Sequence, residues 1–266
     1  AIVYSFTTFL YNLYVRSLPL NDTKQRLEKY FPTHSLPLNL ARIMHEGWRY
    51  DPKQRPSLEK LRSMVEELQK EVAGMDNVRR LGWQDIRMEV VEGAERVNLL
   101  EMVMRIEETE RLRGMKEWKH GGEGSVFTAR TYRGKLVAVK HIYKDPLELN
   151  ILRRLSSLKE RRIVKLRSTI ANLRVVVLKF YPLSLQEVIH GDRIHSFKTF
   201  YGCLHDICTG MCVVHGENVV HRDVKPSNLL VSSEGIVCIS DFGVAYDMGD
   251  VESGSEPAGS LPYMPP

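Results

Sequence analysis

Cysteine is scarce in this chain, whose 266 residues include only Cys203, Cys208, Cys212 and Cys238. Cys208 and Cys212 stand four residues apart, which is not the spacing of a zinc knuckle, and no second knuckle accompanies them. His205 nearby leaves a metal site open as an alternative, but buried core thiols explain the pattern better. The cysteines therefore argue against a disulfide scaffold and indicate a reducing compartment, which we expect to be the cytoplasm while leaving the nucleus open.

Long apolar runs are missing as well. The most apolar stretch, residues 1–15, carries Ser5, Thr7, Thr8 and Asn12. A helix that crosses a membrane needs about 20 consecutive apolar residues. We therefore interpret this stretch as a buried helix and expect no contact with a membrane.

An excess of one charge sign is also missing, since 38 Lys and Arg residues face 33 Asp and Glu residues, a net charge of +5. This mild basic excess suits nucleotide phosphate as well as nucleic acid. A basic cluster leaves a nucleic-acid surface open, but it is equally typical of a solvated face beside a strand, so we expect no nucleic-acid partner. The cluster consists of Lys159, Arg161, Arg162, Lys165 and Arg167.

The first part of the chain has helical patterns, at residues 1–17, 23–30 and 38–48. Ser57 is suited to cap a further helix that has its apolar side chains on one face. Those side chains are Leu58, Leu61, Met64, Val65 and Leu68. Residues 69–115 are rich in Glu and Arg, and we interpret them as a linker that is partly helical. Helical spacing in that linker is kept by Val97, Leu100, Met104 and Leu112.

From residue 116 onward, short β-branched runs predict five strands with one helix at 146–157. Helices are expected next at 184–190 and 197–216, followed by two short strands. We place these strands at 229–232 and 236–239. The order of strands first and helices afterwards favours an α+β fold with two lobes.

The strongest motif is the run H-R-D-V-K-P-S-N at residues 221–228, and Asp241-Phe242-Gly243 begins thirteen residues after it. Upstream, Val137-Ala138-Val139-Lys140 ends sixteen residues after Gly124. In order and spacing, these runs resemble the catalytic loop, the metal-binding triplet and the strand lysine of eukaryotic protein kinases. The resemblance covers residues 116–266 and corresponds to the first two-thirds of a kinase domain.

The resemblance implies the machinery of phosphoryl transfer, in which the moving group needs its charge neutralised and its acceptor aligned. Lys140 is expected to hold the α- and β-phosphates of ATP, while Asn228 and Asp241 offer the oxygen ligands that Mg²⁺ prefers. Asp223 is expected to orient the substrate hydroxyl and accept its proton. Lys225 is typical of serine/threonine kinases, where it contacts the γ-phosphate.

The glycine-rich loop of the family, G-x-G-x-x-G-x-V, falls on residues 119–126. Gly121 and Gly124 are kept, with Gly122 between them, but Lys119 replaces the first glycine. Glycine suits this loop because the backbone must approach the phosphates closely. Lys119 therefore either pairs with phosphate or disturbs the turn.

Glu148 is the expected partner of Lys140, eight residues earlier, in a stretch that resembles the regulatory helix of the family. The interval is shorter than family members usually have. Since Asp145 and Pro146 are suited to begin this helix, Glu148 is also placed to cap it, and both roles stay open.

The adenine pocket is implied by alignment with the fifth strand of the family. The residues expected to surround the adenine are Leu178 as gatekeeper, Lys179, Phe180 and Tyr181 as the hinge, and Val126, Ala138 and Leu230. After the D-F-G triplet the chain resembles an activation segment. Ser253 and Ser255 are either phosphorylation sites, whose phosphate would order the loop by contact with Arg222, or ordinary loop serines.

The order of the segments is unusual. Residues 2–6 and 47–57 resemble D-V-Y-S-F and C-W-x-x-D-P-x-x-R-P-S, two motifs from the last third of a kinase domain, with Ile2 in place of the aspartate. The chain is either a fragment of a tandem-kinase protein or a circularly permuted kinase. In the first case, the missing kinase segments belong to a longer parent chain. The first origin is favoured, although the 47-residue linker, spanning about 70 Å as a helix, permits closure. We expect residues 1–68 to pack against 184–240, because the helices there would otherwise expose a large apolar face.

Together these features predict an α+β, two-lobed, protein-kinase-like fold. Its expected parts are a helical portion of the large lobe at 1–68, a linker at 69–115, the small lobe at 116–181 and the rest of the large lobe at 182–266. The expected activity is transfer of the γ-phosphoryl group of ATP to protein serine or threonine hydroxyls. The alternative is a pseudokinase, a regulatory module that binds ATP without catalysis.

Overall fold

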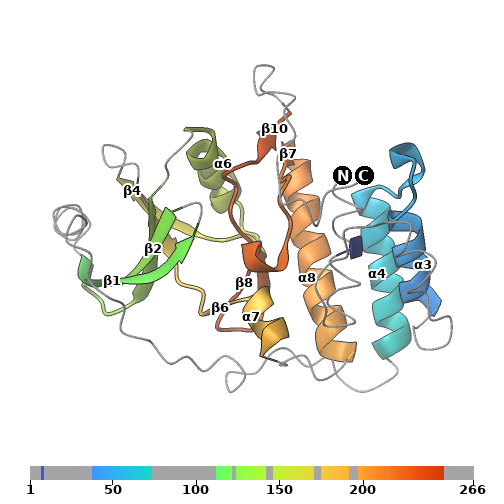
Figure 1. Cartoon of the computed structure of the whole chain (residues 1–266), viewed down its shortest axis with the longest axis horizontal. Coiled ribbons are helices and arrows are strands. Elements are labelled where there is room, and N and C mark those ends of the chain that lie inside the picture. Colours follow the sequence, from blue (N-terminus) through green and yellow to red (C-terminus); the bar gives the residue numbers. More distant parts are fainter. Residues whose placement is uncertain are drawn as a thin grey trace.

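The computed structural model describes residues 7–8, 38–73, 112–121, 124–141, 146–170, 175–191 and 197–248. These residues form an α+β fold, with a five-stranded antiparallel sheet at one end and long helices at the other (Figure 1). The predicted fold class is thereby confirmed at the level of α+β. Within the ranges named above, no helix has the length and apolar character needed to cross a membrane.

The sheet has the strand order β1-β2-β3-β5-β4, so it contains the five strands that the sequence predicts. Its strands are β1 (Leu112–Gly121), β2 (Gly124–Thr131), β3 (Leu136–His141), β4 (Leu166–Ile170) and β5 (Val175–Lys179). In β3, the buried Val137 and Val139 alternate with Ala138 and Lys140, which face the opposite side of the sheet. This alternation decides which side chains of β3 are available to a pocket.

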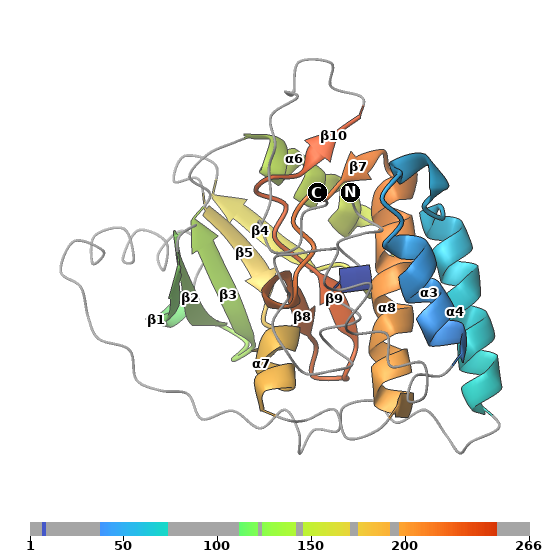
Figure 2. The same cartoon turned by 45° about the vertical axis from the view of Figure 1, so that its right-hand side comes forward.

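Helix α6 (Pro146–Ser157) has the bounds expected from the sequence, and it contacts β4 beside the sheet (Figure 2). Its apolar residues Ile151, Leu152 and Leu155 recur at helical spacing and are buried in the main core. The helix is therefore anchored by one apolar face, and its other faces are free to carry charged side chains.

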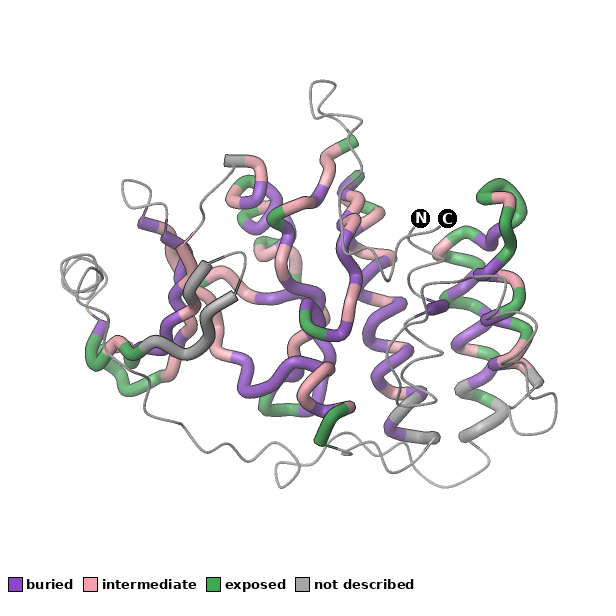
Figure 3. The backbone as a smooth tube through the Cα atoms, in the orientation of Figure 1, coloured by how far each residue is buried: buried purple, intermediate pink, exposed green. Residues whose placement is uncertain are grey.

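The second half of the chain is built around α8 (Phe197–Gly216). Helix α7 (Leu185–His190) and α8 lie where the sequence predicts helices, and β8 and β9 match the two short strands expected after them. The short strands of this half, β8 and β9 included, are β6 (Leu183–Ser184), β7 (Val219–Val220), β8 (Leu229–Val231), β9 (Val237–Ile239) and β10 (Tyr246–Asp247). Strands β6, β8 and β9 form one small sheet, and β7 pairs with β10. Figure 3 shows that α8 and the strands beside it are largely buried.

Helix α4 (Leu58–Ala73) covers the other side of α8, and α3 (Leu38–Gly47) packs against α4. The predicted apolar face of α4 is buried through Leu61, Met64, Val65 and Leu68. The expected capping also occurs, because Ser57 Oγ accepts a hydrogen bond from Lys60 N at 3.1 Å. The contact between α4 and α8 is the packing that we expected between residues 1–68 and the second half of the chain.

A helix and a strand reach into the two ends of the stretch interpreted as a linker, residues 69–115. Helix α4 continues to Ala73, and β1 already begins at Leu112. Leu112, assigned above to helical spacing, is instead buried in the core of the sheet and pairs with Thr131 of β2. Partners across a sheet override a local spacing of apolar residues. The other helical patterns expected in the linker and at 23–30 lie outside the described residues, as does 1–17 except for Thr7 and Thr8, which are helical.

Candidate active site

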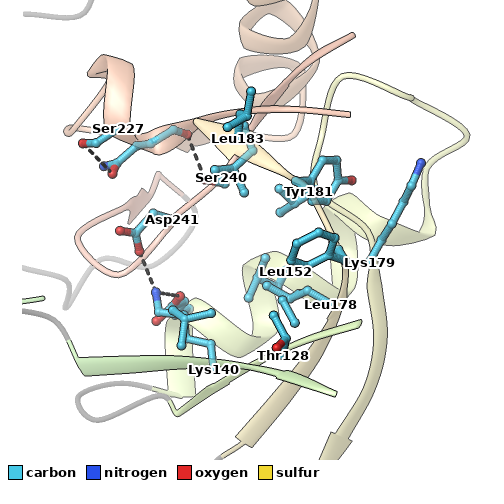
Figure 4. A pocket seen from close by; sticks show the side chains of 17 residues that line it. Thr128, Lys140, Leu152, Leu178, Lys179, Tyr181, Leu183, Ser227, Ser240 and Asp241 are labelled. Atoms are coloured by element: carbon cyan, nitrogen blue, oxygen red, sulfur yellow. Dashed lines mark hydrogen bonds and ion pairs between the residues drawn. The ribbon is translucent and has the colours of Figure 1, made fainter. Parts of the chain in front are cut away.

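A pocket of about 200 Å³ lies between the five-stranded sheet and the small sheet of β6, β8 and β9 (Figure 4). Its walls are apolar where the resemblance implies adenine, and charged groups gather where it implies the phosphates. The predicted residues that line the pocket are Val126, Ala138, Lys140, Glu148, Leu178, Lys179, Phe180, Tyr181, Asn228, Leu230 and Asp241. Residues from six elements and their connections thus converge on one cavity.

Lys140 is the charged centre of this pocket. Its Nζ lies 2.7 Å from Asp241 Oδ1 and 3.1 Å from Glu148 Oε1, and the side chain is 17% exposed. Burial acts to lower the pKa of Lys140, but the carboxylates of Asp241 and Glu148 outweigh it and hold this pKa well above its ordinary value. Lys140 is therefore a fixed cation, and Glu148 faces Lys140 from α6.

The loop at 221–228 fixes Asp223 from two sides. Asn228 Nδ2 donates to Asp223 O at 3.0 Å and to Asp223 Oδ2 at 2.9 Å, and Lys225 Nζ lies 2.7 Å from the same Oδ2. A short 3₁₀ turn (Pro226–Asn228) brings Asn228 back toward the aspartate. Asp223 and Lys225 are adjacent to the pocket through Asn228, although they do not line it themselves.

His221 joins this loop to the D-F-G segment. Its Nε2 lies 2.8 Å from Ser240 O, and because a carbonyl oxygen only accepts, Nε2 carries the proton. Asp223 N donates to His221 Nδ1 at 3.3 Å, so the ring is neutral, and its burial lowers the pKa of His221. Ser240 N and Ser240 Oγ both donate to Asn228 O, at 3.0 and 2.9 Å. The proposed metal ligands Asn228 and Asp241 are thus held by hydrogen bonds between their segments.

The backbone is strained at two points of this site. Arg222 has a φ of 63° and Asp241 a φ of 64°, both in the left-handed region that residues other than glycine rarely adopt. Such a conformation costs about 1–3 kcal/mol and is commonest at functional sites. Arg222 is stabilised there by donating from Nε to Val244 O at 2.6 Å. From this conformation the Asp241 carboxylate points at Lys140 (Figure 4).

Magnesium fits the pair Asn228 and Asp241, since both offer oxygen atoms to one pocket and Mg²⁺ keeps several of its other positions for water and phosphate. The four cysteines, all of them among the described residues, form no disulfide. Among the described residues, His, Cys, Asp and Glu side chains form no group of three suited to a metal ion.

The glycine loop is described only in part. Gly121 ends β1, Gly124 begins β2, and the two residues pair with each other, whereas Gly122 lies outside the described residues. Outside them too are Ser253 and Ser255, together with the motif expected at 2–6.

Six pocket residues were not predicted from the sequence. They are Thr128, Leu152, Val164, Leu183, Ser227 and Ser240. Leu152 follows Glu148 by one helical turn, and Ser227 and Ser240 directly precede the predicted ligands, so spacing alone could have found these three. No local signal marks Val164, which belongs to the connection between α6 and β4.

Comparison with known proteins agrees with this geometry. The family model of the protein kinase domain matches residues 116–266. The serine/threonine-protein kinase crk1 of Schizosaccharomyces pombe is 31% identical over 179 residues, which cover 61% of this chain and 52% of that protein. The leucine-rich repeat receptor-like protein kinase TDR of Arabidopsis thaliana is 30% identical over 168 residues, covering 55% and 16%. Cyclin-dependent kinase 20 of Pongo abelii is 35% identical over 137 residues, covering 47% and 40%. The chain thus spans about half, or less, of the length of these relatives.

Proposed function

We propose that this chain, which belongs to the protein kinase domain family, binds ATP with Mg²⁺ in the pocket around Lys140 and transfers the γ-phosphoryl group to serine or threonine hydroxyls of a protein. The observation that carries the proposal is the contact of Lys140 with both Glu148 and Asp241 beside Asn228. A cation and two oxygen ligands in one cavity suit a metal-bound triphosphate. The relatives described as serine/threonine kinases support the choice of acceptor.

In the proposed arrangement, the five-stranded sheet with α6 is the small lobe, and α7, α8 and the short strands belong to the large lobe. Helix α4 covers α8 and completes the large lobe together with α3, which packs against α4. The adenine lies among Val126, Ala138, Leu178 and Leu230, with the backbone of 179–181 at its edge. The charged end of the pocket then receives the phosphates.

In the transfer step, the hydroxyl oxygen of the substrate forms a bond to the γ-phosphorus while the bond from that phosphorus to the β–γ bridging oxygen breaks. The hydroxyl proton passes to the carboxylate of Asp223, and ADP leaves. Asn228 and Asp241 would hold Mg²⁺, which would supply positive charge to the phosphate oxygens. Lys225, 2.7 Å from Asp223, is placed to stabilise the γ-phosphate.

The second candidate is a module that binds nucleotide without transferring phosphate. Lys119 favours it, because this side chain stands where the family has the first loop glycine. The two candidates share the pocket but differ in what Asp223 does.

Transfer from radiolabelled ATP to a basic protein, compared between the wild type and Asp223→Asn, tests the proposal. The wild type should label the substrate, and the variant should do so about 10²–10⁴ times more slowly while keeping its affinity for ADP. Equal labelling by both proteins would remove Asp223 from the mechanism. Binding of ADP without labelling by the wild type would select the second candidate.

A further inference from the structure

The end of α6 that lies away from Glu148 carries a second ion pair. Arg154 Nη2 lies 2.7 Å from Asp247 Oδ2 in β10, and Arg154 Nε lies 4.0 Å from Glu217 Oε2, just after α8. The Asp247 side chain is only 14% exposed. Helix α6 is therefore joined at its far end to the segment that follows Asp241-Phe242-Gly243.

The two ion pairs of α6 belong to one closed ring of contacts. Glu148 and Arg154 are six residues apart, which is about 9 Å along a helix. Glu148 contacts Lys140, Lys140 contacts Asp241, and the chain from Asp241 leads to Asp247 and back to Arg154. Between Asp241 and Asp247 the segment runs close to α6. A Cβ atom added at Gly243 would lie only 3.5 Å from Glu148 Oε2. A shift of either α6 or the segment would have to break one of the pairs.

Asp247 is a firm anchor because its segment is bound to the loop that carries Asp223. Strand β10 pairs with β7, in the register of Asp247 with Val219, and Met248 N donates to Asn218 O at 2.9 Å. Three residues before Asp247, Val244 O accepts a hydrogen bond from Arg222 Nε at 2.6 Å. Arg154 thus ties α6 to the backbone that positions the catalytic loop.

We propose that Arg154 is a positioning residue, which acts through Asp247 to hold α6 in the orientation that presents Glu148 to Lys140. The consequence for catalysis rests on the proposed kinase function. Since ion pairs that reach solvent contribute little to overall stability, the pair is suited to bias the position of one helix without deciding whether the domain folds. A change in the segment that moves Asp247 would then be transmitted to Glu148 through α6.

Arg153 provides a matched control on the same helix. It is exposed, and its Nη2 donates to Thr169 Oγ1 of β4 at 3.0 Å rather than to the segment at 241–248. Arg153→Met and Arg154→Met remove the same charge and keep the same aliphatic stem. Only Arg154→Met breaks the contact with Asp247.

The first measurement is the steady-state rate of transfer from ATP. Arg154→Met should lower kcat about 2- to 30-fold, the range expected when a coupling contact is removed, and Asp247→Ala should do the same. Arg153→Met should leave kcat unchanged. In a Glu148→Gln background Arg154→Met should add no further loss, because both changes interrupt one path. Additive losses would overturn the inference, since a residue that acted independently of Glu148 would produce them.

The second measurement needs no activity. Hydrogen exchange of the free protein is followed in peptides that cover 146–157 and 241–248. Arg154→Met should raise exchange in both peptides, and Arg153→Met in neither. Equal exchange in the two variants would overturn the inference, whatever the kinase assay shows. A wild type without transfer would instead contradict the proposed function, and the exchange data would still decide the role of Arg154.

Discussion

Lys140 and Asp241 stand 101 residues apart in the chain, yet Lys140 Nζ lies 2.7 Å from Asp241 Oδ1. Strand β3, which carries Lys140, and the loop after β9 therefore meet at this ion pair. Because Glu148 contacts the same ammonium group at 3.1 Å, two carboxylates share one cation. Any metal or phosphate that enters must rearrange this group of three charges, and the first two predictions follow from that competition.

Lys140→Met should abolish most of the transfer activity. Methionine keeps the aliphatic stem but leaves Glu148 and Asp241 without their common cation. Removing one electrostatic contact of this kind costs about 10²–10³ in kcat. The comparison is with Lys135→Met, in which an exposed lysine of the β2–β3 turn loses the same charge. Steady-state labelling by the two variants measures the effect, and comparable rates for both would contradict the role given to Lys140.

Chelation of Mg²⁺ should weaken the binding of ADP by at least about tenfold, equivalent to ~1.4 kcal/mol. Without the metal, Asp241 remains paired with Lys140, and two carboxylates then face the incoming phosphates. Titration calorimetry with Mg²⁺ and with EDTA measures the difference. In Asp241→Asn the dependence on Mg²⁺ should largely disappear, because one of the two ligands is lost. A wild type that binds ADP equally well under both conditions would argue against a metal at Asn228 and Asp241.

Much of this arrangement could be predicted from local patterns. The bounds of α6 follow from Pro146 and from apolar residues at helical spacing. The packing of α4 against α8 follows from the apolar face of α4. The charged pocket residues were found because the runs at 137–140, 221–228 and 241–243 are distinctive. Their convergence in one cavity agrees with the roles predicted for them, which stay predictions.

What could not be predicted depends on contacts between distant parts of the chain. Leu112 was assigned to a helical pattern because its strand partner, Thr131, belongs to the next strand of the chain, which local spacing does not reveal. Val164 lines the pocket from the connection between α6 and β4, where no pattern in the sequence marks it. The pair of Arg154 with Asp247 spans 93 residues, and neither residue belongs to a motif.

Leu61→Ala in α4 should lower the free energy of unfolding by about 2–5 kcal/mol. Leu61 is fully buried at the contact of α4 with α8, so the substitution leaves a cavity in the main core. Ser63→Ala, at an exposed position of the same helix, is the control. Urea unfolding followed by circular dichroism measures both variants. If Leu61→Ala unfolds like Ser63→Ala, residues 58–73 do not contribute to the core of the second half of the chain.

Acid should destabilise the fold below pH 6.5, in part through His221. Burial lowers the pKa of this imidazole below its ordinary value of 6.5, and burial likewise lowers the pKa of His205 and of His215. The native state therefore binds fewer protons than the unfolded chain in this range. The stability that comes from keeping these rings neutral is fully present above pH 6.5, and it is lost as the pH falls toward the pKa of the folded state.

The contribution of His221 can be isolated with His221→Gln, whose side-chain amide is able to donate to Ser240 O as the ring does. Each histidine that is neutral when folded and charged when unfolded contributes a slope of up to about 1.4 kcal/mol per pH unit. Urea unfolding between pH 5 and 8 should show a smaller slope for the variant than for the wild type below pH 6.5, and parallel curves between pH 7 and 8. The comparison of slopes removes any constant loss of stability that the substitution causes. Parallel curves over the whole range would mean that His221 takes up a proton in the folded state, which the hydrogen bond from Asp223 N to Nδ1 does not allow.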